Sequence, residues 1–251
     1  MLKNSLIVIF TLLSQFTFAQ SSRELFNEAN DLYAKKNYEE AAKKYEAIVA
    51  NGFESSALYY NLGNAYFKTK NIPSAILYYE KAALLDPSND DIVFNLELAR
   101  TYTIDKIEPI PQFFLVSMVK WFRGLFSANT WAIIAIVAFL IALVCFGLFW
   151  FATGIHIRRT SFYFAIILFV AFGFSIYFSV SAKNQIVNHR YAIVFSPVIS
   201  VKSSPDDSGS DLFILHEGTK VEVLRSVGEW SEVQIADGNK GWLHNQSFKK
   251  I

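Results

Sequence analysis

Two stretches of the chain show the same pattern of apolar and polar residues. The segment from Asn27 to Ile48 aligns with the segment from Asn61 to Ala82 at an offset of 34 residues, and seven of the 22 positions are identical. In each copy, apolar and small residues recur three or four positions apart on both sides of a polar break, as in two amphipathic helices joined by a turn. We therefore predict two helix–turn–helix repeats, at about 22–55 and 56–89.

A third unit begins after the second copy but does not finish. Residues 90–102 continue the helical register, with Val93 and Leu96 expected to face inward, and the sequence "TIDKIEPIP" then breaks the pattern. We predict a capping helix here. Repeats of this kind stack on their neighbours, and about three are normally needed for stability. We therefore expect further support from a partner, from a second copy of the chain, or from the segment next to the membrane.

The second copy resembles the tetratricopeptide repeat, a helix pair of 34 residues. The residues that carry the resemblance are Leu62, Gly63, Tyr66, Ala75, Tyr79, Ala82 and Pro87. The first copy matches less well, with Glu28 and Ala29 in place of Leu-Gly. The resemblance implies an α-helical tetratricopeptide solenoid over residues 20–104 that binds proteins.

In tetratricopeptide folds the first helix of each repeat lines the concave face, and residues at i, i+4 and i+7 share one side of a helix. The positions so placed form a candidate partner-binding groove: Phe26, Asn30, Tyr33, Tyr60, Asn64, Phe67 and Phe94. Aromatic rings supply contact area, and asparagine can both donate to and accept from a peptide backbone. The alternative is that the asparagines tie neighbouring helices together.

Two long apolar segments follow the repeats. Residues 131–151 and 161–180 carry no charge, and at about 1.5 Å per residue each is long enough to cross the roughly 30 Å hydrocarbon core. We predict two transmembrane helices, with a buried helix pair of a soluble protein as the alternative. The preceding residues 111–129 are amphipathic, which favours an interfacial helix or an extension of the first span.

The N-terminus has the pattern of a secretory signal. Lys3 precedes a short apolar run, and Thr17 and Ala19 are small residues at the positions that signal peptidase requires. We predict a signal peptide at 1–19, with an uncleaved anchor as the alternative. Export places the repeats and the C-terminus in the periplasm of a bacterial inner-membrane protein, and leaves Arg158 and Arg159 in the cytoplasmic turn, as the positive-inside rule prefers.

After residue 190 the helical period gives way to alternation. Four or five short strands separated by turns are expected over residues 191–251, closing into a small all-β barrel. The segments "VISVKSSP", "HEGTKVEVL" and "GNKGWLH" resemble the bacterial SH3 domain. For Trp230 and Trp242 we expect packing in the barrel core, with ligand stacking as the alternative.

Composition and charge exclude several functions. The net charge of +1 does not suit nucleic-acid binding, and the single cysteine, Cys145, lies in the first predicted span, where it cannot form an intrachain disulfide. No phosphate-binding loop, metal-binding motif or nucleophile motif occurs, and the four histidines are scattered. We therefore expect a multidomain membrane protein that is no enzyme and needs no cofactor.

The order of signal, repeats, two spans and SH3 domain resembles the BatE family of the bacterial Bat (aerotolerance) operon. The resemblance implies a scaffold whose partners are membrane proteins with von Willebrand A domains, together with a MoxR-type ATPase on the cytoplasmic side. The alternative function is a cell-envelope protein whose SH3-like domain binds peptidoglycan.

Overall fold

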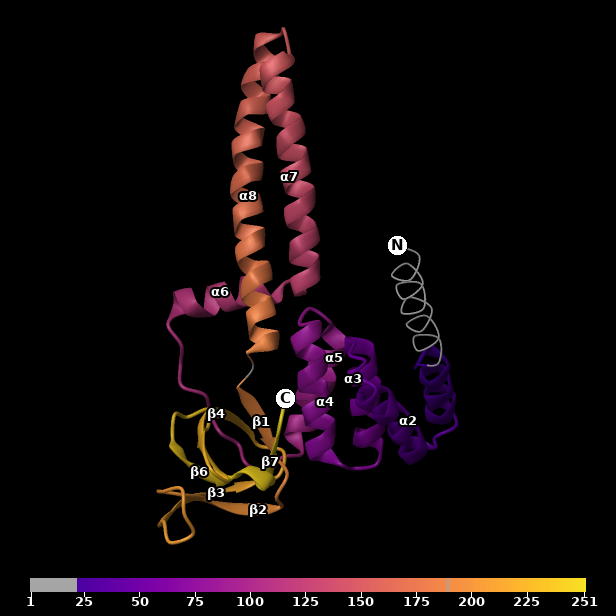
Figure 1. Cartoon of the computed structure of the whole chain (residues 1–251), viewed down its shortest axis with the longest axis vertical. Coiled ribbons are helices and arrows are strands. Elements are labelled where there is room, and N and C mark those ends of the chain that lie inside the picture. Colours follow the sequence, from indigo (N-terminus) through magenta and orange to yellow (C-terminus); the bar gives the residue numbers. More distant parts are fainter. Residues whose placement is uncertain (1–21, 189) are drawn as a thin grey trace, which may run out of the picture. The chain divides into compact units, whose positions relative to one another are not determined.

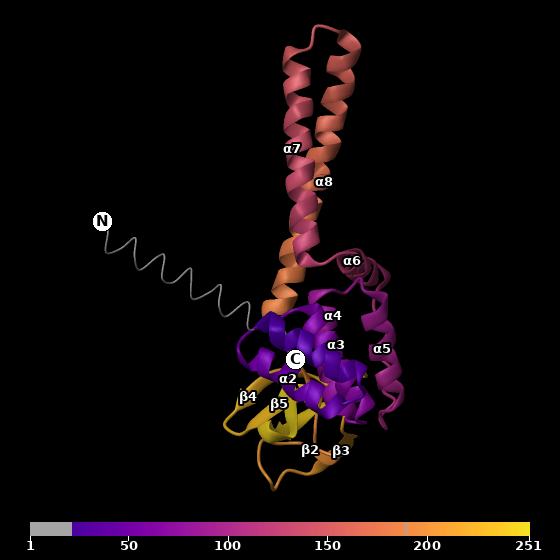
Figure 2. The same ribbon diagram turned by 90° about the vertical axis from the view of Figure 1, so that its right-hand side faces the viewer.

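The structure, a computed structural model, describes residues 22–188 and 190–251 (Figure 1 and Figure 2). The predicted signal peptide at 1–19 lies outside these residues. The described chain forms two compact units. One contains the repeats, residues 90–109 and the C-terminal residues 190–251, and the other contains residues 84–89 and 110–189. We call residues 190–251 the C-terminal β domain.

Five helices form the repeat region: residues 22–34, α2 (Tyr38–Ala50), α3 (Ser56–Lys68), α4 (Ile72–Leu85) and α5 (Asp90–Thr101). The first four form two helix pairs at the predicted 34-residue interval, and α5 follows as a single helix. Pro73 lies in the first turn of α4, where its missing N–H is not needed. The Ser55 hydroxyl caps α3 by accepting from the Leu58 N–H.

The turn within each helix pair has the same backbone geometry. Lys36 and Lys70, which occupy equivalent positions, adopt left-handed φ angles of 64° and 63°. The next residue in each turn closes the preceding helix, with Asn37 N–H donating to Leu32 and Asn71 N–H to Tyr66. Asn37 sits at φ −84° and ψ 64° and its side chain makes no capping bond, whereas the Asn71 side chain accepts from the Ser74 N–H at 3.2 Å.

Small residues lie where the helices approach most closely. Ala29, Ala41 and Ala75 are fully buried. At Gly63 of α3, a Cβ atom would lie 2.7 Å from the ring of Tyr79 on α4, so only glycine fits without displacing that ring. Because large side chains of the neighbouring helix fill the space above these positions, the repeat pattern needs a glycine or alanine there.

The C-terminal β domain is one antiparallel sheet of seven strands in the order β3-β2-β6-β5-β4-β1-β7. The strands are β1 (Tyr191–Val194), β2 (Val198–Lys202), β3 (Asp211–His216), β4 (Lys220–Val227), β5 (Trp230–Gln234), β6 (Lys240–His244) and β7 (Phe248–Lys250). Every strand contributes to one buried apolar cluster, so the sheet curls around a single core. The sequence pattern predicted only four or five strands, because β1 and β7 are too short to show alternation.

The second unit contains α6 (Phe114–Gly124), α7 (Ala128–Phe151) and α8 (Ile155–Val187). α6 and α7 are separate helices, because Ser127 begins α7 by accepting from the Thr130 N–H. α7 and α8 run side by side as a hairpin in both views (Figure 1 and Figure 2). The small residues Ala135, Ala138 and Ala142 are buried between them.

Among the described residues, α7 and α8 are the two helices long and apolar enough to cross a membrane. Only 17% of the most apolar 18-residue stretch of α7 is buried, and only 11% of the corresponding stretch of α8. Helices in the core of a soluble protein bury their apolar side chains, whereas these expose them. The hairpin is therefore compatible with two membrane spans.

Candidate functional site

The seven candidate groove residues lie on three helices of the repeat region. Phe26, Asn30 and Tyr33 are on helix 22–34, Tyr60, Asn64 and Phe67 are on α3, and Phe94 is on α5. The structure shows what each asparagine and each ring contacts, and these contacts decide which of the groups a partner could reach.

The two groove asparagines form equivalent hydrogen bonds across the repeats. Asn30 Oδ1 accepts from Tyr45 Oη at 2.6 Å and from Asn61 Nδ2 at 3.0 Å. One repeat later, Asn64 Oδ1 accepts from Tyr79 Oη at 2.6 Å and from Asn95 Nδ2 at 3.0 Å. Each asparagine thus joins its own repeat to the next helix pair or to α5, as the structural alternative proposed.

The tyrosines act as donors in this network. Burial raises the pKa of Tyr45 to about 12 and also raises the pKa of Tyr79, so both hydroxyls keep their protons at neutral pH. Within residues 22–188 and 190–251, Nδ2 of Asn30 and of Asn64 donates to no other residue. The asparagines can therefore offer donors to a ligand, while their oxygens are already engaged.

The groove aromatics become more exposed toward α5. Phe26 packs on Tyr45 with ring centroids 5.8 Å apart, and Tyr60 lies 6.0 Å from Tyr79. At the other end, Phe94 is 68% exposed. Tyr102, just after α5, is 61% exposed, and its ring meets Phe67 edge-on at 5.4 Å. The aromatic surface open to a partner is thus concentrated around α5.

Sequence reasoning missed Asn61, Asn95 and Tyr102. The first two could have been found, because Asn27, Asn61 and Asn95 follow one another at intervals of 34 residues. Only the first two of these three positions fall inside the aligned repeats. Tyr102 gave no such signal, since it lies where the helical pattern ends.

A short segment after α5 joins the repeats to the C-terminal β domain. The Asp105 carboxylate accepts from the His216 backbone N–H at 2.7 Å and from the Thr219 hydroxyl at 2.6 Å, and it meets His216 Nδ1 at 2.7 Å. Gly218 lies in the same turn at φ 87°, where a Cβ atom would come within 2.8 Å of Thr103. The turn between β3 and β4 is therefore shaped to receive this segment.

A buried carboxylate forms the second link between the repeats and the β domain. Glu80 of α4 is 5% exposed. It contacts Arg100 of α5 at 2.6 Å and Lys220 of β4 at 2.7 Å. Burial alone would raise the pKa of Glu80, but the two cations outweigh it and lower the pKa below its ordinary value of 4.5. The β domain thus supplies the support that we expected from a partner, a second copy or the membrane-proximal segment.

The link at Asp105 should weaken in acid. Burial alone would raise its pKa, but the bonds from Thr219 and His216 outweigh this and lower the pKa from 3.8. A carboxyl whose pKa is lowered by folding contributes fully at neutral pH and loses that contribution below about pH 4. As the pH falls from 5 to 3, the exchange rate of the His216 amide hydrogen, divided by its intrinsic rate at the same pH, should therefore rise.

The variant Asp105→Asn is the matched control for this titration, because its carboxamide keeps the shape and cannot ionise. Its exchange at His216 should be faster than in the parent chain at pH 7 and should change less between pH 5 and pH 3. Equal pH dependence in the two proteins would contradict the assignment.

The two tryptophans of the β domain differ in burial. Trp242 is 7% exposed and lies 5.2 Å below the Arg225 guanidinium, so it is packed as expected. Trp230 is only half-buried, so the expected core packing does not hold for it, and its ring lies edge-on to His244 at 5.6 Å. Its ring is therefore available for surface contacts, as the ligand-stacking alternative requires.

The described part of the chain contains no group of three or more His, Cys, Asp or Glu side chains placed to hold a metal ion. The carboxylates with lowered pKa face Lys, Arg, His, Ser or Thr partners instead.

Comparisons with known proteins identify two modules. The tetratricopeptide repeat family matches residues 56–89, and the bacterial SH3 domain family matches residues 197–249. No curated protein matches the chain. Both families are typically non-catalytic interaction modules, the first associated with protein–protein interaction and the second with binding in the cell envelope. The chain therefore combines a tetratricopeptide repeat region with a bacterial SH3 domain.

Proposed function

We propose that this protein is a membrane-anchored scaffold that binds an extended segment of a protein partner on its repeat domain. The observation that carries the proposal is the exposed aromatic surface of Phe94, on the helix whose Asn95 donates to Asn64, and of Tyr102, which packs on Phe67. Aromatic side chains give large contact area for little loss of conformational entropy and are enriched at binding hot spots. An extended peptide would place apolar side chains on these rings and a backbone carbonyl near Asn64 Nδ2.

The proposed location is the bacterial inner membrane, with α7 and α8 as two spans and both interaction domains in the periplasm. The exposed apolar surface of the hairpin supports the spans, and the signal-like N-terminal sequence supports the orientation. The module order further suggests a BatE-like role beside membrane proteins with von Willebrand A domains, in a complex linked to oxygen or stress tolerance.

The test compares two neighbouring side chains on α5. Phe94→Ala should lower the affinity for the partner by about thirtyfold or more, because truncating a central aromatic at a hot spot costs about 2 kcal/mol or more. Val93→Ala is the matched control, since Val93, which we expected to face inward, is instead exposed, at 43%, on the same helix. Co-purification from native membranes, quantified against the bait by mass spectrometry, gives the readout.

Because the Phe94 ring is 68% exposed, neither substitution should alter helix content. Equal partner recovery with both variants, in a folded protein, would overturn the groove assignment. Asn30→Ala and Asn64→Ala are poorer probes, since each leaves a buried tyrosine hydroxyl without its acceptor.

A second candidate function is peptidoglycan binding by the β domain. The half-buried Trp230 beside His244 favours it, because an accessible indole can stack on a sugar face. Retention of the chain on purified sacculi, and its loss in Trp230→Ala but not in Phe94→Ala, would support this function in place of the first.

A further inference from the structure

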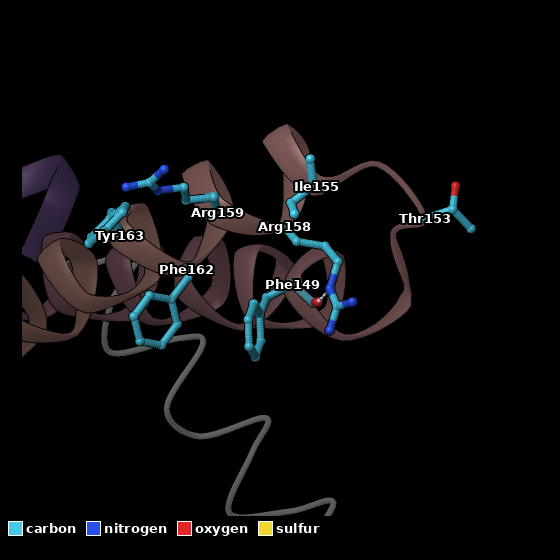
Figure 3. Close-up of a pocket in the computed structure, with 7 residues that line it drawn as sticks. All are labelled: Phe149, Thr153, Ile155, Arg158, Arg159, Phe162 and Tyr163. Atoms are coloured by element: carbon cyan, nitrogen blue, oxygen red, sulfur yellow. Dashed lines mark hydrogen bonds between the residues drawn. The ribbon is translucent and has the colours of Figure 1, made fainter.

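The turn between α7 and α8 borders an open hollow of about 460 Å³ (Figure 3). Phe149 at the end of α7 and Phe162 on α8 form one wall, with ring centroids 5.2 Å apart. The lining is completed by Thr153, Ile155, Arg158, Arg159 and Tyr163. Figure 3 shows the Arg158 guanidinium beside Phe149 and the Arg159 guanidinium beside Tyr163, so the hollow combines an aromatic wall with a cation on each side of it.

The first arginine is held in place by the end of α7. Arg158 Nε donates to the Phe149 carbonyl at 3.2 Å, and its guanidinium lies 5.7 Å from the centre of the Phe149 ring. Figure 3 shows this bond closing the turn. The two Nη groups make no hydrogen bond within residues 22–188 and 190–251. The guanidinium is thus oriented while most of its donors stay open.

The chain supplies no anion to either arginine. Between Glu108 and Asp206 the sequence contains no acidic residue, and neither Arg158 nor Arg159 pairs with a carboxylate in the described part of the chain. Arg159 is exposed. Both guanidinium groups are therefore without an anionic partner in the described part of the chain.

The opposite end of the hairpin fixes the depth of this hollow. Phe178 of α8 stacks on Phe122 of the amphipathic helix α6 at 6.3 Å, and Trp131 donates to the Arg123 carbonyl at 3.2 Å. From Phe178 to Arg159 is 19 residues, or about 28 Å of helix, close to the roughly 30 Å hydrocarbon thickness. If α6 lies at one membrane–water interface, this length of helix places Arg158 and Arg159 at the depth of the lipid headgroups at the opposite interface.

We propose that this hollow binds the phosphate group of an anionic phospholipid, which rests on the membrane insertion proposed above. Guanidinium groups bind phosphate oxygens through paired charge-assisted hydrogen bonds. The aromatic wall and the exposed apolar sides of α7 and α8 suit acyl chains, which inorganic phosphate lacks. The site ties one lipid to the turn of the hairpin.

The test uses the full-length protein in nanodiscs of phosphatidylcholine and phosphatidylglycerol in equal parts. After release, native mass spectrometry measures how much phosphatidylglycerol stays bound. In Arg158→Gln/Arg159→Gln this retention should fall by about tenfold or more, because glutamine cannot form the paired charge-assisted hydrogen bonds by which a guanidinium group holds phosphate oxygens. Arg158→Lys/Arg159→Lys, which keeps the charge, should retain more lipid than the glutamine variant.

The matched control is Lys120→Gln/Arg123→Gln, which removes two cations near the other end of the hairpin and should retain phosphatidylglycerol like the parent. Equal loss in this control, or no loss in Arg158→Gln/Arg159→Gln, would overturn the site. Displacement of the lipid by inorganic phosphate at equal concentration would show a general anion site and would also overturn the proposal. Resistance of the protein to carbonate extraction tests the membrane spans separately, and partner recovery tests the repeat domain.

Discussion

Removing both cations that face Glu80, in Arg100→Met/Lys220→Met, should lower the free energy of opening by about 3 to 5 kcal/mol. The carboxylate would then stay buried, at 5% exposure, with no compensating charge. Native-state hydrogen exchange of α4 and β4 in the full chain gives this free energy. Both helix and strand should lose protection together, because Glu80 joins one to the other.

The control adds Glu80→Leu to the same double variant. This triple variant removes the buried charge as well as its partners, and apolar replacements of buried ion groups are often neutral or stabilising. Protection should therefore return toward that of the parent chain. If the triple variant opens as readily as the double variant, packing of the long side chains and not their charge holds α4 against β4.

Truncating Tyr79 should have an effect of similar size on the repeats. Tyr79→Ala removes a side chain that is 1% exposed, fills the space above Gly63 and donates to Asn64, so a loss of about 3 to 5 kcal/mol is expected. Hydrogen exchange of α3 and α4 is the measurement. A melting temperature of the whole chain would be a poor guide to this local loss, because the α7–α8 hairpin and the repeats need not unfold in a single transition.

Tyr79→Phe separates the ring from the hydroxyl. It keeps the contact with Gly63 and removes only the bond to Asn64, so about 1 kcal/mol should be lost. Tyr45→Phe, one repeat earlier, should behave alike because its bond to Asn30 is equivalent. A Phe variant as unstable as the Ala variant would place the stabilisation in the hydrogen bond and contradict the packing argument.

The repeats were predictable because the sequence signals for each helix pair lie close together in the chain and occur twice. The 34-residue offset, the small residues at close contacts and the apolar spacing all lie within one helix pair, and the turns at Lys36 and Lys70 share one geometry. The similarity does not extend to capping, because the Asn71 side chain accepts from the Ser74 N–H while the equivalent Asn37 side chain makes no capping bond.

The docking of the β domain on the repeats could not be predicted. Asp105 and His216 are 111 positions apart and Glu80 and Lys220 are 140 apart, and no periodic pattern links residues at such distances. For the groove residues, the sequence shows which polar groups are present but not which of their atoms already form hydrogen bonds. Residue types identified Asn30 and Asn64 as polar groups on the right face, but only coordinates show which lone pairs are already used.

The bonds of Asp105 and Glu80 also bear on the two proposed binding surfaces. Because these bonds join the repeats and the SH3 domain within one compact unit, a ligand with one motif for each proposed surface would meet both on the same unit. The second contact then forms at an effective concentration set by the ligand's own linker. Partners would be distinguished by the spacing of their motifs as well as by their sequence, and a linker of the wrong length would lose the avidity while keeping each single contact.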